Sequence, residues 1–106
     1  MPSIWCALRT FAAHAKEMGG EPLPSPRFFL KPWAALAQPP MGCEMVLPPH
    51  LNEAHHEVEL VLKLGEDATL TEIAVGLDLT DRGTQEEAKA AGMPWTQSKG
   101  FVNSAI

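Results

Sequence analysis

Three acidic residues in the second half of the chain have the types and spacing that suit a bound metal ion. Glu57 and Glu59 are separated by one residue in the segment HEVELVLKL, and a β-strand would direct both side chains to the same face. Asp78 lies in the apolar segment VGLDL, where a buried carboxylate needs a partner that offsets its charge. Hard divalent cations prefer carboxylate oxygens. A solvated strand face, a strand end in water or an ion pair with Arg82 would explain the same residues without a metal.

The four histidines suggest two further kinds of site. His14 and Glu17 are three residues apart in a predicted helix, so they would share one helix face. A carboxylate beside an imidazole raises its basicity, as a general base requires, although a surface ion pair has the same spacing. His50, His55 and His56 raise a zinc alternative, but their spacing matches no zinc signature and no cysteine ligand accompanies them.

Strands must position the acidic residues. Residues 56–64 alternate apolar and polar side chains, which predicts a strand with one buried face. The segment IAVGLDL, residues 73–79, favours a second strand, although Thr69–Glu72 just before it also matches a helix capping box. Shorter strands are predicted at residues 4–11, 27–30, 45–47 and 99–102.

Glycine, proline and capping residues indicate where helices and loops lie. A helix is predicted at residues 12–18, where a Gly-Gly pair ends it. A second helix is predicted to begin at the capping box Thr84–Glu87 and to end at Gly92. Most of the ten prolines lie between residues 22 and 49, so this region is predicted to form extended loops and short strands.

Length and composition indicate one soluble, cytoplasmic domain. The chain has 106 residues, of which 45% are hydrophobic and 20% charged, as in ordinary globular proteins. Its net charge of -5 argues against a nucleic-acid partner. No apolar run could cross a bilayer, and the first residues do not resemble a secretion signal. Cys6 and Cys43 are predicted to be reduced thiols, with a single disulfide as the alternative.

Five motifs, in this order along the chain, resemble those of the fumarylacetoacetate hydrolase family. They are IWCALRTFAAHAKEM, RFFLKPWAAL, PPHLNEAHHEVELVLKLG, GLDLTDRGTQ and PWTQSKGF. They resemble, in turn, the family's opening strand with its lid helix, the substrate loop, the metal-binding strand, the segment with a third metal carboxylate, and the Pro-Trp-Thr-x-x-Lys signature. The resemblance is to the N-terminal half of the domain in acylpyruvases, oxaloacetate decarboxylases and 2-hydroxyhepta-2,4-diene-1,7-dioate isomerases.

The resemblance implies roles for nine residues of this sequence. The implied ligands of Mg²⁺ or Mn²⁺, with Ca²⁺ as a third candidate, are Glu57, Glu59 and Asp78. The implied substrate-binding residues are Arg82, Gln85 and Lys31. The implied catalytic residues are His14, Glu17 and Lys99, in which the lid pair His14 and Glu17 moves a proton and Lys99 adds positive charge where an oxyanion develops.

The implied activity is C–C bond hydrolysis, decarboxylation or isomerisation of a small 2-oxo acid through a metal-stabilised enolate, as in aromatic catabolism. The implied fold is mainly β with short helices (α+β), a partial mixed β-sheet or β-roll truncated at the C-terminus. Residues 1–106 would form a single domain, with the strand and lid helix in 1–20, the Pro-rich substrate loop region in 21–50, and the metal-site strands and helix in 51–106. A homodimer or higher oligomer would cover the open sheet edge.

Three departures from the family pattern leave the enzyme question open. The chain ends where the family domain is about half complete, and the segment between Thr69 and Gly76 is shorter. Gly83 stands where the family has Asp, Ala34 replaces a hydroxyl residue, and Leu8 replaces Gly. An enzyme-derived architecture is favoured because the ligand residues are all present. The alternative is a non-catalytic family remnant that acts only as an interaction or structural module.

Overall fold

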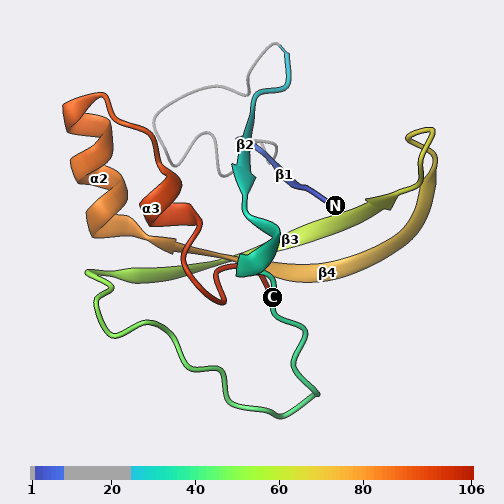
Figure 1. Ribbon diagram of the computed structural model, residues 1–106, viewed down its shortest axis with the longest axis horizontal. Helices are drawn as coiled ribbons and strands as arrows, with labels where there is room; N and C mark the ends of the chain where they lie inside the picture. The colour runs from blue at the N-terminus through green and yellow to red at the C-terminus, as the bar shows by residue number, and fades with distance from the viewer. Residues whose placement is uncertain (1, 9–24) are drawn as a thin grey trace. The chain divides into compact units, whose positions relative to one another are not determined.

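A computed structural model describes residues 2–8 and 25–106 (Figure 1). The chain divides into two units, Met1–Trp33 and Ala34–Ile106. The predicted helix at residues 12–18 lies outside the described residues, and so do His14 and Glu17. None of the helices in the described residues has the length and apolarity needed to span a bilayer.

The first unit contains a short antiparallel pair of strands. Strand β1, Ile4–Ala7, pairs with β2, Phe28–Lys31. The rings of Trp5 and Phe28 pack edge to face, with their centroids 6.0 Å apart, a geometry that aromatic pairs prefer. The strand predicted at 27–30 is confirmed with a shift of one residue, and the strand predicted at 4–11 is confirmed over its first four residues.

The second unit is built on a long β-hairpin. Strand β3, Ala54–Leu64, pairs antiparallel with β4, Leu70–Asp81. Its turn is closed by hydrogen bonds from the Gly65 amide to the Thr69 carbonyl at 2.8 Å and from the Ala68 amide to the Gly65 carbonyl at 3.0 Å. The two strands predicted from alternation and apolar content are therefore confirmed. The capping-box interpretation of residues 69–72 is wrong, because β4 begins at Leu70, directly after the turn, and no helix starts there.

Two helices follow the hairpin and lie side by side at its end far from the turn (Figure 1). Helix α2, Arg82–Ala91, ends at Gly92, which adopts the left-handed conformation with φ 67°, as a glycine after a helix commonly does. Helix α3, Thr96–Lys99, is a single turn. The end of α2 was predicted correctly. Its start was not: the helix begins at Arg82, and its N-cap is Asp81 rather than Thr84.

Two strand predictions are wrong. Residues 45–47 form no strand, although residues 37–53 do form the extended loop that the prolines predict, with a short 3-10 helix, η1 (Trp33–Ala35), before it. The carbonyl of Val46 accepts its hydrogen bond from the Asn103 side chain at 2.9 Å, so a side chain takes the place of a strand partner. Residues 99–102 begin at the last residue of α3 and continue into a turn.

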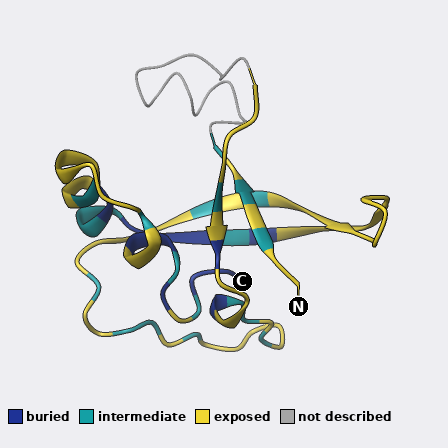
Figure 2. Cartoon of the chain, turned by 45° about the horizontal axis from the view of Figure 1, so that its top comes forward, coloured by how far each residue is buried: buried dark blue, intermediate teal, exposed yellow. Residues whose placement is uncertain are grey.

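The C-terminal segment runs along β4 and holds its second half in place. The Leu77 amide donates to the Ile106 carbonyl at 2.8 Å, and the Leu79 amide donates to the Ser104 carbonyl at 2.8 Å. The small apolar core lies nearby and consists of Ala35, Leu79, Phe101 and Ala105. Figure 2 shows that buried residues of the hairpin gather in this half of β4, whereas the turn half is exposed.

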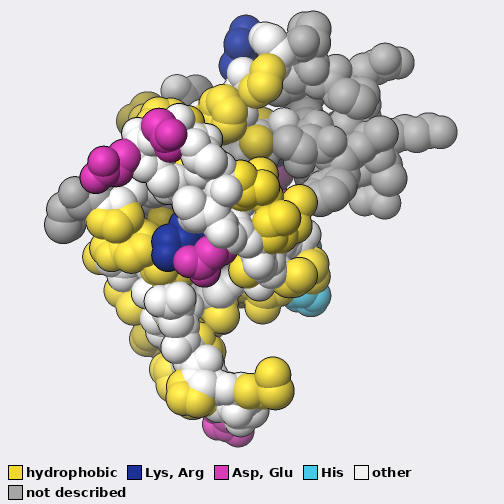
Figure 3. Space-filling view, turned by 90° about the vertical axis from the view of Figure 1, so that its right-hand side faces the viewer, with side chains coloured by type: hydrophobic (Ala, Val, Ile, Leu, Met, Phe, Trp, Pro, Cys, Tyr) yellow, Lys and Arg dark blue, Asp and Glu magenta, His cyan; other side chains and the backbone are white. Residues whose placement is uncertain are grey.

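One face of the hairpin is apolar and exposed. This apolar face is formed by Val58, Leu60, Leu62, Ile73 and Val75, which are 52–77% exposed. The prediction of one buried face on residues 56–64 is therefore wrong in this structure, because more than half of the surface of each of these side chains is exposed. Figure 3 shows hydrophobic side chains at the surface on the side of the hairpin turn, with acidic and basic side chains among them.

Asp81 joins the strand, the helix and the preceding loop. Its carboxylate accepts from the Asn52 amide at 3.1 Å, the Glu53 amide at 2.9 Å and the Thr84 hydroxyl at 2.8 Å. Burial raises the pKa of Asp81, but the hydrogen bonds from Glu53, Asn52 and Thr84 lower the pKa by more, so that it lies below its ordinary value.

Replacement of Asp81 should destabilise the fold. We expect Asp81→Ala to lower the free energy of unfolding by about 2–4 kcal/mol, because a helix cap is lost and buried donors lose their acceptor. The folded pKa lies below the unfolded value of 3.8, so the ionised carboxylate stabilises the fold above that pH, and this contribution is lost as the pH falls through the folded pKa. In urea unfolding, Asp81→Asn should therefore lose less stability on acidification than the unmutated protein. Glu87→Gln, at an exposed site on α2, is the control. If Asp81→Asn lost as much stability on acidification as the unmutated protein, this role of Asp81 would be contradicted.

Gly76 allows the C-terminal segment to approach β4. A Cβ atom at Gly76 would lie 2.8 Å from Val61 Cγ2 and 2.9 Å from the Ile106 carbonyl oxygen. We expect Gly76→Ala to cost about 1–3 kcal/mol of stability, as overpacked sites do, and to speed hydrogen exchange at the Leu77 amide. Gly65→Ala is the matched control, since its Cβ would meet Thr71 Cγ2 at an ordinary 3.4 Å. If the two variants had equal stability and equal hydrogen exchange at the Leu77 amide, this role of Gly76 would be contradicted.

Candidate metal centre

The register of the hairpin brings the three acidic residues together. Glu57 lies directly opposite Asp78, and Glu59 lies opposite Gly76, on the same face of the two strands. Each side chain offers a carboxylate oxygen, and these oxygens all lie within 4.8 Å of one another. A slip of one residue between β3 and β4 would turn one strand's carboxylates to the other face. The site therefore depends directly on the register that the turn sets.

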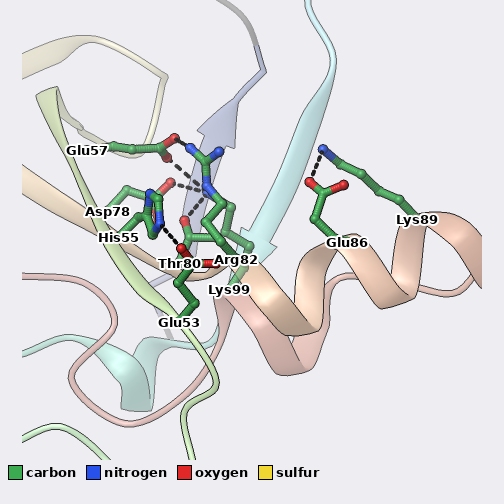
Figure 4. Close-up of polar contacts among 9 residues, drawn as sticks. All are labelled: Glu53, His55, Glu57, Asp78, Thr80, Arg82, Glu86, Lys89 and Lys99. Carbon is green, nitrogen blue, oxygen red and sulfur yellow. Dashed lines mark hydrogen bonds and ion pairs between the residues drawn. The ribbon is translucent and has the colours of Figure 1, made fainter.

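Two basic side chains contact this cluster from the helices (Figure 4). Arg82, the first residue of α2, donates from Nη2 to Glu57 Oε1 at 2.7 Å. Lys99, the last residue of α3, donates from Nζ to Glu57 Oε2 at 3.1 Å and to Asp78 Oδ2 at 2.8 Å. Its third hydrogen bond goes to Thr80 Oγ1 at 2.6 Å. Glu57 thus bridges the two helices through its two oxygens.

Local contacts hold the backbone of Lys99 in place, so that its side chain contacts the carboxylates. The Lys99 amide donates to the Trp95 carbonyl at 3.0 Å, and the Lys99 carbonyl accepts from the Ser104 hydroxyl at 2.9 Å. The ammonium of Lys89 lies 5.4 Å from the centre of the Trp95 ring, a cation–π contact that ties α3 to α2. Lys99 itself is only 4% exposed, so its charge acts in a weakly screened environment.

The charges of the three carboxylates and of the two cations that contact Glu57 can be counted. Three carboxylates and the two cations Arg82 and Lys99 sum to one negative charge. Burial raises the pKa of Glu57, but the charge and hydrogen bond of Lys99 and the charge of Arg82 lower the pKa by more, so that it lies below its ordinary value. Glu57 is consequently ionised near neutral pH.

The donor set fits a hard divalent cation. It offers oxygen ligands only, which Mg²⁺, Mn²⁺ and Ca²⁺ prefer. Asp78 is buried, and Glu57 and Glu59 are partly buried. Because β4 has a glycine opposite Glu59, no β4 side chain stands directly across from that carboxylate. The residual negative charge is of the sign that a cation would neutralise.

The other residues predicted for the site lie in different parts of the chain. Gln85 lies on α2, one turn after Arg82, and is 5% exposed. Lys31 ends β2 in the first unit, whereas the acidic cluster belongs to the second. His14 and Glu17 lie outside the described residues.

The histidines in the described part of the chain do not join a metal-binding group there. His55 Nε2 lies 3.1 Å from Glu53 Oε1 at the surface, and the metal-binding group found among these residues consists of carboxylates alone. Cys6 and Cys43 are thiols rather than a disulfide. The structure thus gives the zinc alternative no support.

Sequence reasoning missed two residues that position the site. Thr80 is fully buried and accepts from Lys99, and Ser104 is fully buried and anchors the Lys99 backbone. Thr80 could have been found, since it lies two residues after Asp78 and so shares its strand face. Ser104 carries no such signal, because the turn that brings it to Lys99 is not periodic.

Comparisons with known proteins agree with this geometry. The family model described as "Fumarylacetoacetate (FAA) hydrolase C-terminal" matches residues 3–106. Oxaloacetate tautomerase FAHD1, mitochondrial, from Mus musculus is 39% identical over 112 residues, covering 96% of this chain and 50% of that protein. The protein of the same name from Arabidopsis thaliana is 40% identical over 107 residues, covering 92% of this chain and 47% of that protein.

A solved structure has the same fold as this chain. Fumarylpyruvate hydrolase from Pseudomonas aeruginosa, in complex with Mn²⁺ and pyruvate, superposes with a TM-score of 0.84 and 34% identity, over 99% of this chain and 51% of that one. The chain spans about half the length of the curated relatives it matches. The expected mainly-β fold with short helices is confirmed, and the chain belongs to the fumarylacetoacetate hydrolase family.

Proposed function

We propose that the chain binds Mg²⁺ or Mn²⁺ through Glu57, Glu59 and Asp78 and serves the hydrolysis, decarboxylation or isomerisation of small 2-oxo acids. The observation that carries this proposal is the approach of three carboxylates to within 4.8 Å of one another. The Pseudomonas aeruginosa relative supports it, since that structure contains Mn²⁺ and pyruvate, which is a 2-oxo acid. Ca²⁺ is a third candidate cation by its ligand preference.

The cation, when bound, would supply Lewis-acid chemistry to the substrate's oxygens. Arg82 would bind the anionic end of the substrate. Its Nε is buried and has no hydrogen-bond acceptor among the described residues, and a carboxylate of the substrate would provide one. Gln85, buried one turn further along α2, is the second substrate-binding residue that we propose, and Lys31 is the third.

Lys99 would stabilise negative charge that develops on the substrate. A buried ammonium is effective in this role because little solvent screens it. A proton must also be moved during any of the three reactions. We assign that step to His14, with Glu17 orienting its imidazole.

A second candidate function is an interaction or structural module without catalysis. The apolar face favours it, because an exposed patch of this kind marks an interaction site in many proteins. The same face would suit the predicted homodimer. The cytoplasmic location and the place in aromatic catabolism also stay predictions.

Cation binding should stabilise the protein. At a cation concentration one hundred times Kd, ligand linkage adds about 2.7 kcal/mol to the free energy of unfolding, which a thermal melt would register as a rise in Tm. Glu57→Gln and Asp78→Asn should abolish the rise. Glu72→Gln is the control, because Glu72 lies outside the acidic cluster and pairs with Lys63 at an exposed site. If neither Mg²⁺ nor Mn²⁺ moved the Tm of the unmutated chain, the module without catalysis would be favoured.

Catalysis should depend on the cation and on His14 in different ways. We expect turnover of oxaloacetate or an acylpyruvate that appears with Mn²⁺ and disappears with a chelator. His14→Ala should lower turnover by about 100-fold or more, as loss of a general base does, and should leave the cation-induced rise in Tm unchanged. Equal loss of turnover and of cation binding would show that His14 has another role.

A further inference from the structure

Lys99 uses all of its hydrogen-bond donors on the site itself. A lysine ammonium has three N–H groups. Lys99 directs them at Glu57 Oε2, Asp78 Oδ2 and Thr80 Oγ1, at 3.1, 2.8 and 2.6 Å. Two of these three acceptors belong to carboxylates that we propose as cation ligands. A substrate oxygen could therefore receive an N–H from Lys99 only if one of these bonds is given up.

The charges of the cluster also suggest that Lys99 takes the place of a cation. With Lys99 and Arg82 in place, the three carboxylates carry one net negative charge. Without Lys99 they would carry two, which a divalent cation would neutralise. The buried ammonium thus neutralises part of the charge that a cation would neutralise, and it contacts the same two side chains, Glu57 and Asp78.

We infer that Lys99 and the divalent cation compete for Glu57 and Asp78, and that Thr80 retains the ammonium when the cation takes these carboxylates. Cation binding would then release two N–H groups of Lys99 toward the substrate. Thr80 is a positioning residue in this scheme, since it acts through Lys99. The inference rests on the proposed cation site, and it deepens that proposal by linking occupancy of the site to the orientation of Lys99.

Titration calorimetry with Mn²⁺ alone would test the competition on the full chain. We expect Lys99→Met to tighten Mn²⁺ binding by about tenfold or more, because it removes both the competing donor and a like charge at contact distance. Lys63→Met is the matched control. It deletes the same charge from an exposed position on β3, where Lys63 pairs with Glu72 at 2.9 Å, and it should leave the affinity unchanged.

Thr80 separates competition from simple repulsion, because its replacement changes no charge. Thr80→Val should weaken Mn²⁺ binding by about tenfold, because without Thr80 the ammonium still has two carboxylate acceptors in the cation-free state but is left with none in the cation-bound state. Thr80→Ser keeps the hydroxyl and should behave like the unmutated protein. If repulsion alone mattered, Thr80→Val would bind Mn²⁺ with unaltered affinity, and the inference would be overturned.

The possible outcomes distinguish this inference from the proposed function. Unaltered or weaker binding in Lys99→Met, in a chain that binds Mn²⁺ through Glu57, would overturn the competition and leave the cation site standing. Absence of binding in both the unmutated chain and Lys99→Met would overturn both. Lys99→Met that folds only when Mn²⁺ is added would support the inference. Should that variant fail to fold under either condition, the Thr80→Val and Thr80→Ser pair decides.

Discussion

Mutual repulsion among three carboxylates is the constraint on which the second unit depends. Glu57, Glu59 and Asp78 share one face of a two-stranded hairpin at distances where like charges destabilise a sheet. The fold tolerates them because Arg82 and Lys99 reach the same point from two helices. Truncating either partner of such a buried pair leaves a charge without compensation, which is generally far more costly than the pair itself is stabilising.

The rest of the second unit can be understood as what holds these charges in place. The hairpin turn sets the register, Asp81 begins α2 so that Arg82 follows β4 without a gap, and the turn after α3 returns Ser104 to the Lys99 backbone. Gly76 lets the C-terminal residues pair with β4 on both sides of Asp78. A buried polar network of this kind is stabilising only when its members have their partners.

How much of this could be predicted from the sequence depends on the range of the interactions involved. The alternation in residues 56–64 is a local, periodic pattern, and it predicted both the strand and the shared face of Glu57 and Glu59. The start of α2 was misplaced because Asp81 and Thr84 are both good capping residues, and the choice between them is made by the loop amides that Asp81 also binds. Residues 45–47 have the composition of a strand, but a strand also needs a neighbouring strand, and no composition records that.

The burial of the hairpin and the position of Lys99 show the same limit at longer range. Alternation indicates which side chains share a face, but it does not say whether another element covers that face, and here the apolar face is exposed. Lys99 was singled out through a family motif, whereas its contacts with Glu57 and Thr80 span 42 and 19 residues of sequence. Such contacts follow from the path of the whole unit.

The central claim is that the three carboxylates form one cation site, and anomalous X-ray scattering from crystals grown with Mn²⁺ would test it most directly. The account predicts a single strong anomalous peak among Glu57, Glu59 and Asp78, about 2.0–2.3 Å from a carboxylate oxygen of each, as hard divalent ions require. A peak at another position, or carboxylates that point into solvent with no peak between them, would contradict it.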